Sequence, residues 1–173
     1  PSVDTIRTFK QNHADIVPDT HPKICAIFPG SRTQEIERLC PVFIKAASIF
    51  CDKYGFKPVL SISSPHYKSL IERLVKQSDL PSIELFSGNS LELMKRATTS
   101  LTSSGTIGLE HALMGVPFVV AYKLNPITYW VGKTFLKQLI EKIPFISLPN
   151  ILMNQMIFPE LIQDKASSRL CVE

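Results

Sequence analysis

Several features that often reveal a function are missing from this 173-residue sequence. The cysteines form no CxxC pair, which argues against a zinc or disulfide framework and favours free thiols in a reducing compartment. The longest apolar run, Val116 to Tyr122, is too short for the roughly 18 residues of a membrane span. The net charge is only +4, without the clustered excess of nucleic-acid-binding proteins, so no nucleic-acid partner is expected.

Motifs for metal ions and for common nucleotides are also missing. The sequence has neither HExxH nor an Asp-x-Asp pair, and its histidines are isolated at His13, His21, His66 and His111. GxGxxG, GxxxxGK[ST] and GxSxG are absent as well. We therefore expect no metal, no cofactor and no nucleophilic serine. The chain begins at Pro1 without a basic and apolar leader, which predicts no signal peptide and a piece of a longer protein.

What is present from Lys23 onward is an alternation of short apolar runs with amphipathic segments of helix length. This alternation predicts an α/β fold with a mostly parallel sheet. The expected strands are Ile24–Phe28, Pro58–Ile62, Ile83–Phe86, Thr99–Thr102 and Val116–Ala121, with Phe145–Ser147 as a candidate sixth. The expected helices are Thr33–Lys53, Pro65–Gln77, Ser90–Ala97 and Thr106–Met114. The polar, proline-containing composition of residues 1–22 predicts a linker, and residues 23–173 are expected to form one domain.

Ligands of open parallel sheets bind beyond the carboxyl ends of the strands, so the residues after each apolar run are informative. After the first run, Gly30 permits a close backbone approach and Arg32 could clamp a phosphate or carboxylate. The alternative is an ordinary turn in which Ser31 or Thr33 caps the helix, Glu35 complements its positive end and Arg32 is solvated.

A second candidate site follows the run that ends near Thr102. Ser104, Gly105 and Thr106 lead into a helix whose free amides and hydroxyls suit a diphosphate. Glu110 lies one turn further on nearly the same face, where its carboxylate could accept hydrogen bonds from ribose hydroxyls. The alternative is simple capping by Ser104 with a solvated Glu110.

A third candidate is Ser87 with Gly88, where main-chain groups could reach the edge of a base. The alternative is a turn in which Asn89 or Ser90 caps the next helix.

These strand ends form a set with a recognisable order. The set consists of Pro29-Gly30-Ser31-Arg32 with Glu35, Ser104-Gly105-Thr106 with Leu109-Glu110, Pro126-Ile127-Thr128-Tyr129-Trp130, and Ser147-Leu148-Pro149-Asn150. From about Ile24 to Leu161 the chain closely resembles the C-terminal half of the lipid-A-disaccharide synthases.

This resemblance implies one half of a GT-B glycosyltransferase, a Rossmann-like domain with helices on both faces of its sheet. The family transfers 2,3-diacylglucosamine from UDP to the 6-hydroxyl of 2,3-diacylglucosamine 1-phosphate (lipid X), with inversion and without a metal. It implies a cytoplasmic protein, peripheral to the inner membrane. The family's N-terminal domain, with its proposed catalytic aspartate and acceptor contacts, has no counterpart here, so we expect UDP binding without turnover and no catalytic residue in this chain.

The resemblance also assigns site residues. Arg32 would stabilise the leaving diphosphate, Ser104 to Thr106 would bind it, Glu110 would bind the ribose, Ser87 and Gly88 the uracil edge, and Asn150 the donor across the cleft. The expected binding set is Gly30, Ser31, Arg32, Ser87, Gly88, Ser104, Gly105, Thr106, Glu110 and Asn150. The sequence departs from the family pattern in having Asn89 after Ser87-Gly88, and in having Gly108 within the phosphate helix, where alanine is usual.

Residues 123–142 form a helical pattern that is apolar on two sides, with Lys133 and Lys137 between them. Such a helix suits an anionic membrane surface, or equally the missing domain or a second copy in a homodimer. Other functional readings stay open: another UDP-sugar GT-B glycosyltransferase or epimerase, or a nucleotide-binding module without catalysis.

Overall fold

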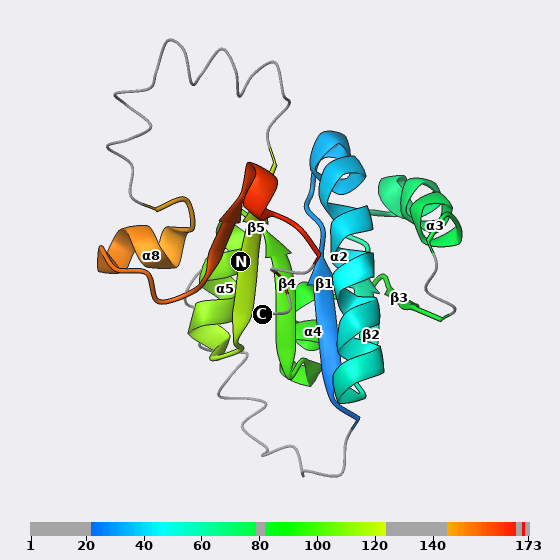
Figure 1. The fold of residues 1–173 in the computed structure, drawn as a ribbon, viewed down its shortest axis with the longest axis horizontal. Coiled ribbons are helices and arrows are strands. Elements are labelled where there is room, and N and C mark those ends of the chain that lie inside the picture. The colour runs from blue at the N-terminus through cyan, green and yellow to red at the C-terminus, as the bar shows by residue number, and fades with distance from the viewer. Residues whose placement is uncertain (1–21, 79–81, 124–144, 169–170, 172–173) are drawn as a thin grey trace.

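The computed structural model describes residues 22–78, 82–123, 145–168 and 171. In this part of the chain six parallel strands form one sheet in the order β3-β2-β1-β4-β5-β6 (Figure 1). The strands are β1 (Ile24–Phe28), β2 (Lys57–Ser61), β3 (Glu84–Phe86), β4 (Thr99–Ser103), β5 (Phe118–Tyr122) and β6 (Glu160–Ile162). The helices are α2 (Thr33–Tyr54), η1 (Pro65–Tyr67), α3 (Lys68–Lys76), α4 (Ser90–Arg96), α5 (Thr106–Met114), α8 (Leu148–Met153) and η2 (Gln163–Lys165). The predicted linker, apart from Pro22, and residues 124–142 of the predicted membrane segment lie outside the described residues.

The sheet carries helices on both faces, which confirms the predicted α/β, Rossmann-like class. Alternate residues of β1 point to opposite sides, so Cys25 and Ile27 pack against α2 while Ala26 and Phe28 pack toward α4 and α5. The strand order reverses between β1 and β4, and in doubly wound sheets this switch point is where ligands bind.

Helix α2 shows why the sequence pattern is predictive. Its apolar positions, three and four residues apart, include Ile36, Leu39, Cys40, Phe43 and Ala47, all fully or almost fully buried against the sheet. Phe50, the last position of this predicted stripe, is only partly buried. The helix ends where Gly55 adopts the left-handed conformation with φ 68°, which glycine tolerates without steric cost.

The predicted sixth strand is wrong. Residues Phe145 to Ser147 form no strand, and the sixth strand is β6, at the edge of the sheet beside β5. The reason is a pair of hydrogen bonds to a carboxylate further along the chain: the amides of Ile146 and Ser147 donate to Glu160, at 2.8 and 2.9 Å, instead of to a neighbouring strand. The helix predicted over Pro65–Gln77 is real, but its first turn is the 3₁₀ segment η1.

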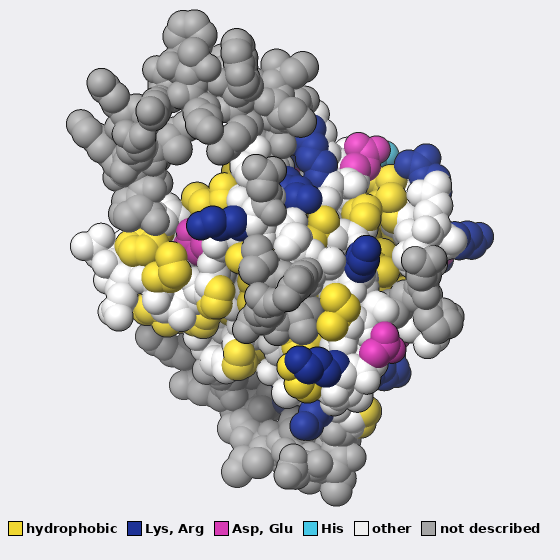
Figure 2. Space-filling model, viewed as in Figure 1, with side chains coloured by type: hydrophobic (Ala, Val, Ile, Leu, Met, Phe, Trp, Pro, Cys, Tyr) yellow, Lys and Arg dark blue, Asp and Glu magenta, His cyan; other side chains and the backbone are white. Residues whose placement is uncertain are grey.

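Three of the four cysteines, Cys25, Cys40 and Cys171, are buried, and all four are free thiols. Burial raises the pKa of Cys25 and Cys40 to about 12, so these thiols stay protonated and packed in the core. On the surface in Figure 2, Lys and Arg side chains are scattered, and hydrophobic side chains lie over the middle of the face as well as on the α8 side. The large exposed apolar residues there are Ile151, Leu152, Met153, Met156 and Ile157.

Candidate functional site

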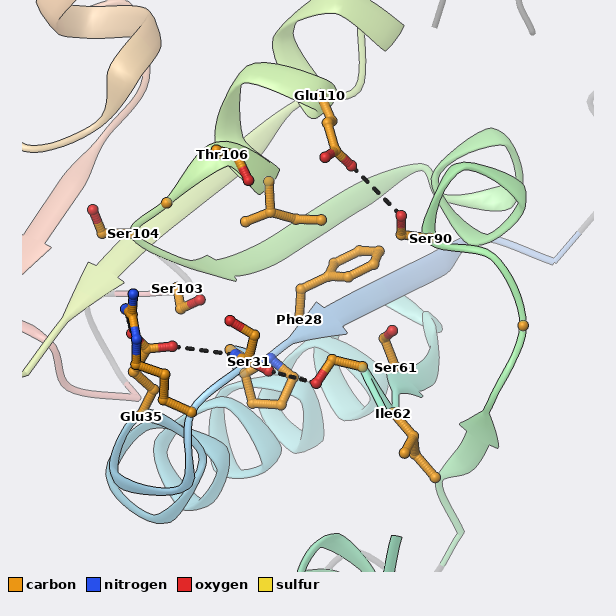
Figure 3. A pocket seen from close by; sticks show the side chains of 17 residues that line it. Phe28, Ser31, Glu35, Ser61, Ile62, Ser90, Ser103, Ser104, Thr106 and Glu110 are labelled. Atoms are coloured by element: carbon orange, nitrogen blue, oxygen red, sulfur yellow. Dashed lines mark hydrogen bonds and ion pairs between the residues drawn. The ribbon is translucent and has the colours of Figure 1, made fainter. Parts of the chain in front are cut away.

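A pocket of about 440 Å³ opens at the carboxyl ends of β1, β2 and β4, at the switch point of the sheet (Figure 3). The segments after these strands meet the beginnings of α2, α4 and α5 there. The pocket is lined by Phe28, Pro29, Gly30, Ser31, Arg32, Glu35, Ser61, Ile62, Ser63, Gly88, Ser90, Ser103, Ser104, Gly105, Thr106, Ile107 and Glu110. Eight of the ten residues in the expected binding set are therefore brought together; Ser87 and Asn150 are not.

The turn from Gly30 to Arg32 forms one side of the pocket. Gly30 has φ 125°, and a Cβ there would lie 2.6 Å from Glu35 Oε2, so this turn requires glycine. The Ser31 amide donates to Glu35 Oε2 at 3.2 Å, and Arg32 Nη1 donates to Glu35 Oε1 at 2.8 Å. Arg32 itself is the N-cap of α2 and neither Ser31 nor Thr33 caps with a side chain, so that part of the alternative is wrong. Its other parts are confirmed, since Glu35 lies in the first turn of α2 and the Arg32 side chain is exposed.

Arg32 carries the one positive charge among the lining side chains. Its side chain is 79% exposed and its hydrogen bond to Glu35 raises the pKa of the guanidinium. One nitrogen is engaged by Glu35, which leaves further N–H donors of the planar group available to an anion.

The carbonyl oxygens of the same turn are held from the side of β2 and η1. Ser63 Oγ donates to the Gly30 carbonyl at 3.0 Å, and the Tyr67 hydroxyl donates to the Ser31 carbonyl at 3.0 Å. Sequence reasoning missed Ser63 and Tyr67, because they are 33 and 36 residues away from their partners. The sequence signal that could have identified them is the cluster of polar residues that follows the second strand.

The N-terminus of α5 forms the wall of the pocket that faces this turn. The N-cap of this helix is Gly105, which has no side chain that could cap it. The neighbouring Ser104 Oγ donates to the Ile146 carbonyl at 3.2 Å instead. The alternative in which Ser104 caps this helix is therefore wrong. Amides in the first turn of a helix have no partner within the helix, so those beside Gly105, Thr106 and Ile107 are suited to bind an anion.

Glu110 lies across the pocket from Glu35, near Ser90 (Figure 3). It is 5% exposed, which rules out the alternative of a solvated side chain. Ser90 Oγ donates to Glu110 Oε2 at 3.5 Å. Burial raises the pKa of this carboxyl group, and the hydrogen bond from Ser90 acts in the opposite direction.

The segment after β3 approaches the pocket through Gly88. A Cβ on Gly88 would lie 2.5 Å from Phe86 Cζ, so the main chain packs directly on the Phe86 ring. Ser87 is exposed and does not line the pocket. The capping alternative is confirmed here, since the side chain of Asn89 accepts from the Leu91 amide at 2.9 Å.

Comparison with known proteins shows the family to which the chain belongs. A family model described as lipid-A-disaccharide synthetase matches residues 1–172. The chain belongs to the lipid-A-disaccharide synthetase family. Lipid-A-disaccharide synthase of Cellvibrio japonicus (strain Ueda107) is 41% identical over 152 residues, which cover 84% of this chain and 37% of that protein. The enzyme of Pseudomonas syringae pv. tomato (strain ATCC BAA-871 / DC3000) is 39% identical over 145 residues, or 83% and 37%.

This member of the lipid-A-disaccharide synthetase family thus spans about 37% of the length of the curated relatives it matches. Solved structures are more distant. A glycosyl transferase family 9 protein from Veillonella parvula DSM 2008 has a TM-score of 0.47 and 17% identity, covering 89% of this chain and 50% of its own. A UDP-GlcNAc 2-epimerase from Methanocaldococcus jannaschii has a TM-score of 0.46 and 18% identity, covering 83% and 42%.

The segment Ser147–Asn150, which the resemblance associates with the donor, does not line the pocket, and Asn150 makes structural contacts instead. Asn150 is fully buried, and its amide nitrogen donates to the Phe158 carbonyl and to Glu160 Oε1, both at 2.8 Å. Its amide oxygen accepts from the backbone of Ile157 and Phe158, at 2.9 and 3.0 Å. With both ends of the amide engaged, Asn150 holds the chain after α8 onto β6.

The described residues hold no group of three or more His, Cys, Asp or Glu side chains placed to bind a metal ion. Among them, no helix has both the length and the apolar character that crossing a bilayer requires. The chemistry visible in the pocket is hydrogen bonding by amides, hydroxyls, one guanidinium and two carboxylates.

Proposed function

We propose that this chain is the donor-binding half of a lipid-A-disaccharide synthase and binds UDP-2,3-diacylglucosamine in the pocket at the switch point. The observation that carries the proposal is the placement of Arg32, the α5 N-terminus and Glu110 around one cavity. These groups match the diphosphate and the ribose of a nucleotide sugar. Family membership supports the same reading.

In the proposed reaction, the glucosaminyl group leaves UDP and is transferred to the 6-hydroxyl of lipid X. Negative charge develops on the departing diphosphate. Arg32 and the first-turn amides of α5 would stabilise that charge with preorganised donors, which is the most effective way a protein can assist a leaving group. In this proposal the acceptor site and the catalytic base would lie in the part of the relatives' length that this chain does not match.

The nucleoside would occupy the other end of the pocket. Glu110, oriented by Ser90, would accept hydrogen bonds from the ribose hydroxyls, and the main chain near Gly88 would meet the uracil edge. Ser87 does not line the pocket, so it would contact the uracil only from beyond the residues that do. Peripheral association with the inner membrane is part of this proposal because both sugar substrates carry acyl chains.

Calorimetric titration of the chain with UDP tests the proposal. We expect binding, and we expect Arg32→Ala to weaken it by about 10- to 100-fold, the effect of losing a charged hydrogen bond. Arg73→Ala is the matched control, since Arg73 is exposed on α3 outside the pocket. Absence of binding by the unaltered chain at millimolar UDP would count decisively against the proposed site.

The ribose contact has its own test. Glu110→Gln should weaken UDP but should have little effect on 2′-deoxy-UDP, because the deleted hydroxyl is one of the groups that the carboxylate would bind. Glu92→Gln, on the exposed surface of α4, is the control. Equal losses for both nucleotides would remove Glu110 from the ribose subsite.

A donor screen addresses the neighbouring possibilities, another UDP-sugar glycosyltransferase or an epimerase. Tighter binding of UDP-2,3-diacylglucosamine than of UDP-N-acetylglucosamine favours the proposed family reaction. The reverse preference favours a different UDP-sugar enzyme.

A further inference from the structure

We propose that Tyr67 is a positioning residue of the diphosphate subsite, acting through the turn from Gly30 to Arg32. The inference deepens the proposed function and rests on it. Tyr67 does not line the pocket, yet its hydroxyl donates to the Ser31 carbonyl at 3.0 Å. It therefore acts on the ligand only through this turn.

The peptide groups around Ser31 are held from two directions. The Ser31 amide donates to Glu35 Oε2 from the first turn of α2, and the Ser31 carbonyl accepts from Tyr67 at the end of η1. One residue earlier, Ser63 donates to the Gly30 carbonyl. Three side chains from two separate segments thus fix a turn whose glycine, at φ 125°, has the most conformational freedom to lose.

These contacts also decide which backbone charges face an anion. A carbonyl oxygen carries partial negative charge and repels a phosphate, whereas an amide attracts it. Hydroxyl donors from Ser63 and Tyr67 cover the carbonyl oxygens of Gly30 and Ser31, and the Arg32 carbonyl accepts from the Ile36 amide at 3.0 Å. A loop that binds phosphate needs this arrangement, because an uncovered carbonyl that rotated into the pocket would oppose the ligand.

Arg32 depends on the same turn. Its side chain is 79% exposed and is ordered by the ion pair with Glu35 and by the position of its own backbone. Loss of the Tyr67 hydrogen bond would let the Ser31 peptide rotate and would move the base of the Arg32 side chain. Binding a diphosphate would then require the turn to be ordered again, at a cost in affinity.

Tyr67→Phe is the direct test, because it removes the hydroxyl and keeps the ring. Tyr54→Phe is the matched control, since Tyr54 ends α2 on the surface and is 46% exposed. The full chain is titrated with UDP, inorganic diphosphate and uridine, and its melting temperature is measured. We expect Tyr67→Phe to bind UDP and inorganic diphosphate about fivefold more weakly, the size of one neutral hydrogen bond. Uridine affinity and melting temperature should match those of the control.

The outcomes separate the two ideas. If the unaltered chain binds UDP and Tyr67→Phe binds it equally well, the positioning role is refuted and the proposed function stands. Equal weakening of UDP and uridine, with a lower melting temperature, would show a merely structural role and also refutes the inference. If the unaltered chain binds neither UDP nor inorganic diphosphate, the proposed function and the inference fall together.

Discussion

We expect His111 to make the stability of this fold sensitive to acid. It lies on α5, fully buried, with its ring against those of Phe28 and Phe118 at centroid distances of 4.8 and 5.3 Å. Its Nδ1–H donates to the Ile107 carbonyl at 2.8 Å, and in the described residues Nε2 has no hydrogen-bond partner. A second proton would sit on Nε2 in this apolar setting. Burial therefore lowers the pKa of His111 from 6.5 to about 4, against a smaller opposite effect of the Ile107 hydrogen bond.

The magnitude follows from linkage. In the unfolded chain the imidazole takes up its proton near pH 6.5, while in the folded chain it does so near pH 4. Between these values the unfolded state binds more protons, so the free energy of unfolding falls as the pH falls. The difference corresponds to about 3 kcal/mol, complete near pH 4 and absent above pH 7. That is a large part of the roughly 5–15 kcal/mol that stabilises a typical domain.

Urea unfolding of the chain and of His111→Gln, measured from pH 7.5 to pH 4, isolates this contribution. Because the substitution itself changes the free energy of unfolding at pH 7.5, only the change of this free energy with pH is compared between the two proteins. Unaltered protein should lose about 3 kcal/mol more than the variant across this range. His66→Gln, at an exposed position on η1, controls for the loss of an imidazole. Parallel pH curves for the chain and His111→Gln would refute the reasoning.

Three further substitutions probe the pocket and its support. Gly30→Ala should cost about 1–3 kcal/mol of stability, because its φ is 125° and the new Cβ would meet Glu35, and UDP binding measured by calorimetry should be lost. Glu110→Gln should stabilise the fold at pH 7, since burial raises the pKa of the carboxyl and so disfavours the charged form. In thermal melts this gain in stability should vanish as the pH falls below 4.5, where both side chains are neutral, and a gain that is the same at every pH would contradict the prediction. Asn150→Ala should lower the free energy of unfolding in urea by about 2–4 kcal/mol, because it leaves the buried partners of Asn150 unpaired, and UDP affinity should not change. Weaker UDP binding by a variant of unchanged stability would instead support a donor contact.

The sequence predicts the framework of this site because the framework is local. The periodic apolar positions of α2 identify that helix, and the short β-branched runs identify five of the six strands, with small differences at their ends. The rule that parallel strands present their carboxyl ends at one edge then brings Gly30, Gly105 and Glu110 together without any knowledge of contacts.

Long-range hydrogen bonds explain what the sequence could not predict. Glu160 accepts from Ile146, from the Ser147 backbone and hydroxyl, and from Asn150, and these partners lie 10 to 14 residues away in the chain. Nothing in the local pattern marks a carboxylate in a three-residue edge strand as the partner of a helix start. The same holds for Tyr67, whose effect on the Ser31 carbonyl depends on the packing of two separate β-α connections.

The charges around the pocket place a limit on how it binds a diphosphate. The lining holds one guanidinium, on Arg32, and two carboxylates, on Glu35 and Glu110, and the first of these carboxylates already pairs with Arg32. The net charge of the lining therefore does not attract the ligand; apart from the single guanidinium of Arg32, oriented donors from the α5 amides and the hydroxyls must bind it. Donors of this kind are screened little by salt, whereas attraction by several exposed cations is screened strongly. UDP affinity should consequently fall only slightly as the salt concentration is raised, and a steep fall would mean that further cations reach the diphosphate and that the donor-based account is insufficient.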